Sequence, residues 1–300
     1  MEGGKLMIEK FSEGNLPELA AYACRKNARR ESGSAFCCRE EASIRRDFLE
    51  TLEFGALWRE AGRIRGILSC FPDWEKGNVD CALLVDREGY DSTAGQLLRA
   101  ARERLGSHLR YTFFFPKENE DCTAFLEGIG AQRRENEYRM VLQRDDWRPM
   151  EGLPEPRPLA EGEEVPFAQL HDQVFPDVYV SGRDILGDLG KNRFVYVLEE
   201  DGALAAYGVL QCVGSRTTAE ILGVRQGLRG RGYGRAILNC LAKEAFYRHG
   251  AAELDLIVDA DNDRALGLYQ KTGFQILEEN RCYLLQPEMQ QSCAEKEHAV

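Results

Sequence analysis

The sequence predicts a mixed α/β (α+β) fold built from two similar domains in tandem. Three observations predict it: the 300 residues exceed one typical domain, a proline-rich break lies near the middle, and one half repeats the other. The composition, with 43% hydrophobic and 30% charged residues, is that of a globular protein and excludes a disordered or fibrous chain.

The break is the segment 145–158, DDWRPMEGLPEPRP, whose four prolines disfavour a helix or a central strand. We therefore predict a first domain over residues 1–144 and a linker over residues 145–158. A second domain is predicted over residues 159–286, followed by a flexible tail over residues 287–300.

The repeat is clearest at a constant offset of 143 residues, where residues 111–142 align with residues 254–285. This alignment puts Asn119 over Asn262. Each half shows the patterns of two helices, two or three strands, a helix, a strand, a helix and a final strand, in that order. We therefore expect the same mixed α/β unit twice.

The net charge of −11 lies mostly in the second half, where residues 151–300 hold 15 Lys and Arg against 24 Asp and Glu. This balance argues against a nucleic-acid partner, which needs a basic face. An acidic domain suits a cationic or amine ligand.

Nothing in the sequence directs the chain to a membrane or out of the cytoplasm. No stretch approaches the roughly 18 apolar residues of a membrane helix, and the start has no apolar leader. The ten cysteines include no C-x-x-C pair, so we expect reduced thiols and no metal. A cytoplasmic protein without a membrane partner is expected.

Residues 219–246 show the pattern of a strand, a glycine loop and a helix. The loop is RGRGYG at residues 229–234, directly before the helix. Glycines there let successive backbone N–H groups approach a ligand, and the helix dipole adds positive partial charge. Four arginines gather beside those amides: Arg225, Arg229, Arg231 and Arg235. We therefore predict a phosphate or pyrophosphate ligand.

Three other interpretations of the loop compete. A plain glycine turn with solvated charges is an alternative for any short motif. A dinucleotide fingerprint needs G-x-G-x-x-G, but Arg235 stands where the third glycine is required. A P-loop needs G-x-x-x-x-G-K-[ST], which the segment lacks.

Two segments resemble the GNAT superfamily of acyl-CoA-dependent N-acetyltransferases. Residues 229–234 match its acyl-CoA loop, Q/R-x-x-G-x-G/A. A later segment is similar to its N-x-x-A-x-x-x-Y-x-K-x-G-F pattern through Asn262, Ala265, Tyr269, Lys271, Gly273 and Phe274. With the repeat, the resemblance implies two tandem GNAT-like domains, each a mostly antiparallel mixed sheet flanked by helices.

The resemblance also implies the reaction: transfer of an acetyl group from acetyl-CoA to an amine by direct attack in the C-terminal domain. The strand before the loop would hydrogen-bond the pantetheine arm through its backbone, and the loop amides would hold the pyrophosphate. The implied cofactor-binding residues are Leu222, Gly223, Val224, Arg229, Gly230, Arg231, Gly232, Tyr233, Gly234, Arg235 and Asn262.

Direct acetyl transfer needs a neutral amine, a stabilised oxyanion and a proton for the departing thiolate. The resemblance gives Tyr269 the role of the acid, and a phenol is protonated at neutral pH. A core aromatic is the alternative. Glu220 is our candidate base, because strand alternation puts it on the face of Leu222 and Val224. A plain surface carboxylate is an equal alternative.

Residues 169–186 stand in the place of the superfamily's first two helices and their loop, which cover the acceptor. Phe175, Tyr179 and Ser181 are the predicted acceptor-pocket residues. A helix connector with packed aromatics is an equal interpretation. We expect His171 on the surface of a helix.

The first half lacks the residues for this chemistry. Its segment 86–95, DREGYDSTAG, has no matching arginine or glycine trio, and Leu126 stands at the position of Tyr269. We therefore predict a degenerate, non-catalytic copy with a structural role. Two other functions stay open, a non-catalytic acyl-CoA sensor or assembly module and a nucleotide-dependent enzyme. A homodimer is also left open.

Overall fold

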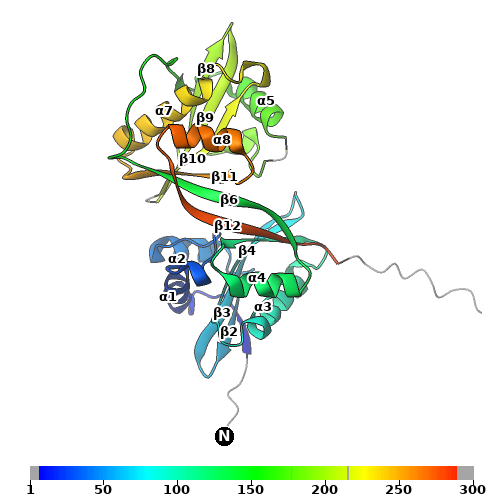
Figure 1. Ribbon diagram of the computed structural model, residues 1–300. Helices are drawn as coiled ribbons and strands as arrows, with labels where there is room; N and C mark the ends of the chain where they lie inside the picture. The colour runs from blue at the N-terminus through cyan, green and yellow to red at the C-terminus, as the bar shows by residue number, and fades with distance from the viewer. Residues whose placement is uncertain (1–6, 177, 215, 289–300) are drawn as a thin grey trace, which may run out of the picture. The chain divides into compact units, whose positions relative to one another are not determined.

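The structure is a computed structural model and describes residues 7–176, 178–214 and 216–288 (Figure 1). The chain divides into two compact units. Of the described residues, the first unit holds 7–136 and 279–288, and the second unit holds 137–278. The predicted tail from residue 289 onward lies outside the described residues.

The first unit is a mixed sheet with helices. Its helices are α1 (Leu16–Asn27), α2 (Glu41–Glu50), α3 (Tyr90–Leu105) and α4 (Glu120–Gly128), with a 3₁₀ turn at Arg30–Ser32. Its strands are β1 (Met7–Lys10), β2 (Ala56–Glu60), β3 (Arg63–Asp73), β4 (Asn78–Val85), β5 (Arg110–Pro116) and the end of β12 (Gln275–Leu285). In that order they are hydrogen-bonded neighbours, and within the unit only the β4–β5 ladder is parallel.

The second unit repeats this plan. Its strands, in spatial order, are β6 (Gln132–Gln143), β11 (Glu253–Asp259), β10 (Arg216–Val224), β9 (Ala203–Val213), β8 (Arg193–Glu200) and β7 (Arg157–Pro158). Among its described ladders, the one between β10 and β11 is parallel and the others are antiparallel. Its helices are α5 (Glu164–Val174), α6 (Gly182–Gly187), α7 (Tyr233–Lys243) and α8 (Asp263–Lys271), with a 3₁₀ turn at Gln226–Leu228 and a π turn at Glu244–Arg248. The predicted α+β class with mostly antiparallel sheets is confirmed.

The last strand of each half pairs within the other unit. Residues 137–143 of β6 pair with β11, and residues 280–285 of β12 pair with β5. The predicted domains assigned residues 137–144 to the first half and residues 279–286 to the second, so the compact units differ from them at these two strands. The two strands are copies of one repeat, and their residue pattern does not specify which sheet each one completes.

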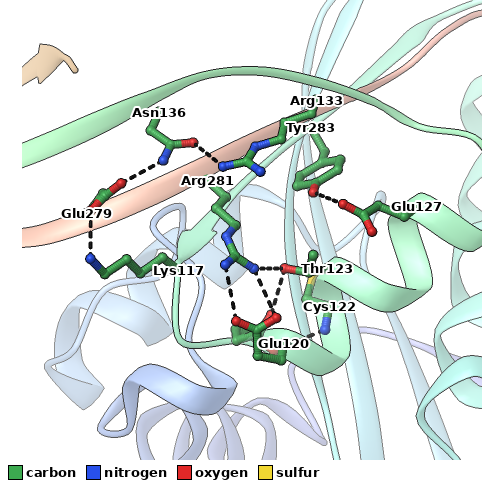
Figure 2. A network of polar contacts seen from close by, with 11 residues as sticks. Lys117, Glu120, Cys122, Thr123, Glu127, Arg133, Asn136, Glu279, Arg281 and Tyr283 are labelled. Atoms are coloured by element: carbon green, nitrogen blue, oxygen red, sulfur yellow. Dashed lines mark hydrogen bonds and ion pairs between the residues drawn. The ribbon is translucent and has the colours of Figure 1, made fainter. Parts of the chain in front are cut away.

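A polar network holds β12 in the first unit (Figure 2). The guanidinium of Arg281 donates to Glu120 and to Thr123, and Tyr283 donates to Glu127. Glu279 accepts from Lys117 at 2.8 Å and from Asn136 at 2.7 Å. Each of these contacts joins the last strand to an element of the first half, so the exchange is built into the side chains as well as the backbone.

Each face of the second sheet packs against its own helices. On one face Leu210 of β9 contacts a core that includes Ile237 and Leu241 of α7. On the other face Tyr207 of β9 packs with Phe167 of α5. This alternation along β9 is what separates the two faces used below.

The predicted linker packs on the second unit. Trp147 is buried against Phe246, and residues 157–158 form the edge strand β7, where a proline is tolerated. Within the described residues, no helix combines the length and apolarity needed to cross a membrane.

Candidate functional site

The parallel strands β10 and β11 meet at one point. In the described chain their ladder consists of a single pair, Thr218 with Asp255. Asp255 is buried, and its carboxylate accepts from Thr218 at 2.6 Å, from Arg216 at 2.8 Å and from Arg139 at 3.0 Å. Beyond this anchored point, the edge of β10 that runs to Val224 has no ladder partner on the β11 side among the residues that the structure describes. Its backbone groups are available to a ligand.

The glycine loop after β10 leads into α7. Gly230 and Gly232 have φ angles of +88° and +91°, a region that only glycine adopts freely, and Gly232 is the N-cap of α7. The first helical hydrogen bond runs from the N–H of Ala236 to Gly232. Among the described residues, no acceptor is recorded for the six backbone N–H groups of residues 230–235. These amides form a ready anion site at the positive end of the helix.

The third loop glycine, Gly234, lies where the loop, β10 and α8 meet. A Cβ at Gly234 would lie 3.3 Å from Leu268 of α8 and 3.6 Å from Leu222 of β10. The side chains of Leu222, Val224 and Tyr233 are partly buried against the core beneath α7. The predicted strand residues and the predicted loop residues therefore lie next to each other at Gly234.

The four loop arginines differ in their contacts. Arg229 donates to the carbonyl of Val224 at 3.2 Å, and Arg225 donates to the carbonyl of Leu204. Arg231 pairs with Glu200 at 2.9 Å, whereas Arg235 is exposed and has no recorded partner among the described residues. All four lie within or next to the loop, so their positive charge accompanies the free amides.

Tyr269 and Asn262 both lie on α8. Burial raises the pKa of Tyr269 to about 12, and its ring lies 6.0 Å from that of Phe274. Within the described chain no hydrogen-bond partner is recorded for its hydroxyl. Asn262 is the N-cap of α8, and its side chain accepts from the N–H of Ala265 at 3.1 Å. The structure therefore gives Asn262 a helix-capping contact at the position predicted for cofactor binding.

The predicted orientation of Glu220 is wrong. Ala219 pairs with Leu210 and Ile221 pairs with Val209, so Glu220 is the extra residue of a β-bulge. The bulge breaks the alternation and turns the Glu220 side chain away from the face of Leu222 and Val224.

On the opposite face, the Glu220 carboxylate is fully engaged. Arg193 of β8 holds it with two hydrogen bonds of 2.7 Å, and Tyr179 and Gln211 donate to it at 2.8 Å and 3.1 Å. Only 3% of the Glu220 side chain is exposed.

The three predicted acceptor residues lie at or near the α5–α6 connection. Phe175 is the C-cap of α5 and packs on the core beneath it, whereas Tyr179 is exposed. Ser181 caps α6 through reciprocal hydrogen bonds with Asp184, so its hydroxyl already has a structural partner. Of the three, Tyr179 contacts the other predicted site residue, Glu220.

His171 is fully buried, so its predicted place on a helix surface is wrong. Its Nδ1 lies 2.8 Å from the hydroxyl of Tyr207, and its Nε2 lies 2.8 Å from the carbonyl of Val180. Sequence reasoning also missed Tyr207 and Arg193. The one available signal was Gly223 within a strand, which indicates close approach by another group but does not name it.

No three His, Cys, Asp or Glu side chains gather as metal ligands within the described residues. The nine cysteines of that part of the chain form no disulfide with one another.

Comparison with known proteins finds a matching family for the second unit. Residues 156–274 match the model of the acetyltransferase (GNAT) family. Acetyltransferase YE1169 of Yersinia enterocolitica is 34% identical over 79 residues, which are 26% of this chain and 55% of that protein. The chain thus spans about half the length of this curated relative.

Two solved structures resemble nearly the whole chain in fold. A GCN5-related N-acetyltransferase from Sphaerobacter thermophilus has a TM-score of 0.77 at 15% identity, covering 93% of this chain and 95% of that one. A tandem GNAT protein from the clavulanic acid biosynthesis pathway has a TM-score of 0.69 at 18% identity, covering 95% and 100%. The second unit therefore contains a segment that matches the acetyltransferase (GNAT) family, and the fold of the chain resembles that of a tandem GNAT protein.

Proposed function

We propose that the second unit transfers an acetyl group from acetyl-CoA to an amine. The observation that carries the proposal is a run of six backbone N–H groups, those of residues 230–235, for which the described residues offer no recorded acceptor. The run lies at the start of α7 and beside the open edge of β10. An amide cluster at a helix N-terminus suits a pyrophosphate. An open strand edge suits the amide groups of a pantetheine arm.

In this proposal the loop and β10 hold the donor along its length. The amides of residues 230–235 bind the pyrophosphate, with Arg229, Arg231 and Arg235 supplying charge. The backbone of Leu222, Gly223 and Val224 bonds the pantetheine arm, and a backbone N–H of this strand stabilises the oxyanion. Asn262 contributes by fixing the start of α8.

Tyr269 is the proposed acid. Because burial raises its pKa to about 12, its hydroxyl stays protonated at neutral pH. The amine nitrogen attacks the thioester carbonyl, the C–S bond breaks, and the phenol proton passes to the departing thiolate. The proton lost by the amine goes to solvent or a base, and the phenolate is reprotonated from water.

Glu220 stays in the proposal as the carboxylate on the acceptor side, and its contacts favour a holding role over a basic one. To take a proton it would have to release Arg193, which bonds both of its oxygens. While paired, it fixes Tyr179, which we propose lines the acceptor pocket with Phe175 and Ser181. The acidic second half would attract a cationic amine. We further propose a cytoplasmic setting, where acetyl-CoA is present.

The direct experiment is calorimetric titration of the whole chain with acetyl-CoA, with NAD and ATP as controls, followed by a thiol-release screen of amines. The proposal expects binding of acetyl-CoA in preference to both nucleotides, and thiol release with at least one amine. Preferential binding of NAD or ATP would contradict it and support a nucleotide-dependent enzyme.

A non-catalytic acyl-CoA sensor is the second candidate, and the occupied state of Glu220 favours it because that carboxylate is not free to act as a base. A sensor would bind acetyl-CoA and release no thiol above the background rate with any amine in the screen. Thiol release that saturates with one amine would exclude the sensor.

A further inference from the structure

We propose that His171 and Tyr207 form a buried clamp that holds the acceptor-side segment 178–182 against the cofactor strand β10. The inference rests on the proposed function, which assigns segment 178–182 to the acceptor side and β10 to binding of the donor. The clamp itself consists of hydrogen bonds and packing contacts within the second unit. His171 and Tyr207 are positioning residues in this proposal, since neither touches the proposed reacting atoms.

The chemistry of the contacts fixes the tautomer of His171. A carbonyl oxygen only accepts, so Nε2, 2.8 Å from the carbonyl of Val180, must carry a hydrogen. In the neutral ring Nδ1 is then an acceptor, and the Tyr207 hydroxyl donates to it over 2.8 Å. Burial raises the pKa of Tyr207 well above its usual value, so the phenol keeps the proton it donates. Both ring nitrogens are therefore satisfied in a fully buried site.

The Tyr207 end of the clamp lies against β10. Tyr207 and Gly223 are directly paired residues of β9 and β10. A Cβ built on Gly223 would fall 2.3 Å from the Tyr207 ring and 2.8 Å from its hydroxyl oxygen, so the ring occupies the space of a side chain. Gly223 is the middle residue of the strand segment proposed to bind the pantetheine arm. Moving Tyr207 would therefore disturb that segment.

The His171 end lies against the acceptor-side segment, and α5 adds two further contacts there. The carboxylate of Asp172 accepts from the N–H of Gly182 at 3.1 Å. Gly182 lies so close to α5 that a Cβ would fall 2.6 Å from the Cα of Ala168. Residues 180 and 182 are thus both fixed to α5, on either side of Ser181.

Tyr179 ties the same segment to β10 at a second point. Its hydroxyl donates to Glu220, the bulge residue of β10, at 2.8 Å. The segment is therefore joined to one strand twice: on the surface by Tyr179 to Glu220, and in the core from Val180 through His171 and Tyr207 to Gly223. Two attachments to one strand fix both the distance and the rotation of the segment, and so the direction in which Tyr179 faces the acceptor.

Substitutions at His171 can cut the two links separately. Asparagine places an amide near the Nδ1 position, so His171→Asn keeps a partner for Tyr207 and loses the donor to Val180. Glutamine reaches the Nε2 position, so His171→Gln keeps the donor to Val180 and loses the acceptor for Tyr207. Tyr207→Phe removes the hydroxyl and keeps the ring against Gly223. Tyr196→Phe is the matched control, because Tyr196 is buried in the same sheet and donates to Glu244 on the other face.

The test is amide hydrogen exchange of residues 178–182 in the full chain without ligand. We expect His171→Asn to raise exchange there about tenfold, the effect of one buried hydrogen bond, with His171→Gln close to wild type. Tyr207→Phe should lie between them, and Tyr196→Phe should leave the segment unchanged. Equal exchange in all variants, or a rise spread evenly over the whole second unit, would overturn the clamp.

A kinetic arm tests the positioning role with the amine found by the thiol-release screen. We expect His171→Asn and Tyr207→Phe to raise the KM for that amine about tenfold and to leave the affinity for acetyl-CoA within about twofold of wild type. An unchanged KM would overturn the positioning role. If acetyl-CoA does not bind the wild-type chain, the proposed function fails, and the exchange measurement still decides the clamp.

Discussion

The two units share one sheet plan and differ where their parallel strands meet. In the first unit β4 and β5 form four ladder pairs, from Asn78 with Arg110 to Cys81 with Phe113. In the second unit the described ladder between β10 and β11 holds one pair, Thr218 with Asp255. The same sheet plan thus has a longer parallel ladder in the first unit and an open strand edge in the second.

The loops after these strands also differ, and the second unit has the longer loop with more glycines in the left-handed region. Four residues separate β4 from α3, and eight separate β10 from α7. The short loop has one left-handed glycine, Gly89, before α3, whereas the long loop has two, Gly230 and Gly232. The comparison teaches that the fold needs only a turn at this place. The extra loop length and glycines provide the row of free amides that we propose for binding of the acyl donor.

The largest expected effect concerns Tyr269, whose counterpart in the first unit is Leu126. We expect Tyr269→Phe to lower kcat about 100-fold in the thiol-release assay, because the departing thiolate loses its proton donor. The affinity for acetyl-CoA should stay within about twofold. Leu126→Met in the first unit is the control and should leave kcat unchanged. A Tyr269→Phe variant with wild-type kcat would remove the proposed acid.

The second effect is a pH dependence confined to the first unit. In the first unit, Asp80 of β4 pairs with Thr112 of β5. The equivalent pair in the second unit is Thr218 of β10 with Asp255 of β11, so the acidic residue lies on the other strand of the pair. Burial, the main cause, raises the pKa of Asp80 to about 6. A raised carboxyl pKa favours the protonated form in the folded state, so its stabilising contribution is present at low pH and lost as the pH rises from about 4 to about 6.

We therefore expect Asp80→Asn to stabilise the first unit by about 2 kcal/mol at pH 8 and to have little effect at pH 4. Amide exchange in β3 to β5, measured at both pH values with correction for intrinsic rates, checks this. Thr218 does not titrate, so amides of β9 and β10 serve as the internal reference. Equal stabilisation at both pH values would contradict the account of Asp80.

A matched glycine pair tests the loops. Gly232 and Gly89 both cap their helices with positive φ angles, +91° and +68°, so alanine strains both positions. We expect Gly232→Ala to weaken acetyl-CoA binding about tenfold and Gly89→Ala to leave it unchanged, as measured by calorimetry. If both variants weakened acetyl-CoA binding equally, the assignment of the donor site to the loop of the second unit would be contradicted.

The smallest expected difference between the two copies concerns the repeated asparagines Asn119 and Asn262. Both accept from a backbone N–H as N-caps, at 3.2 Å and 3.1 Å. Asn119 is also buried and donates to the carbonyl of Gly33 at 3.0 Å, whereas Asn262 is exposed. We expect Asn119→Ala to cost about 2 kcal/mol and Asn262→Ala about 1 kcal/mol in local amide exchange. A larger cost for Asn262→Ala than for Asn119→Ala would contradict the additional stabilisation that we assign to the buried Asn119.

Much of the fold could be predicted from the sequence, because the repeat and the element patterns are local signals. The loop at residues 229–234 was also readable, since left-handed φ angles at a helix start require glycine. The strand exchange was not readable, because β6 and β12 are copies of one repeat and fit either sheet by pattern.

The errors at the site have local physical causes. One extra residue in β10 turned Glu220 to the other face, and a bulge leaves no mark in the hydrophobic pattern. His171 was misplaced because its burial depends on two distant partners, Tyr207 and Val180, which no local pattern identifies.

The most direct measurement is the stoichiometry of acetyl-CoA binding to the wild-type chain by calorimetry. The account predicts one site per chain, lost or weakened by Gly232→Ala and untouched by Gly89→Ala. Two sites per chain would contradict the view that the first unit has lost the donor site. The absence of binding would contradict the central claim that the free amides of residues 230–235 hold acetyl-CoA.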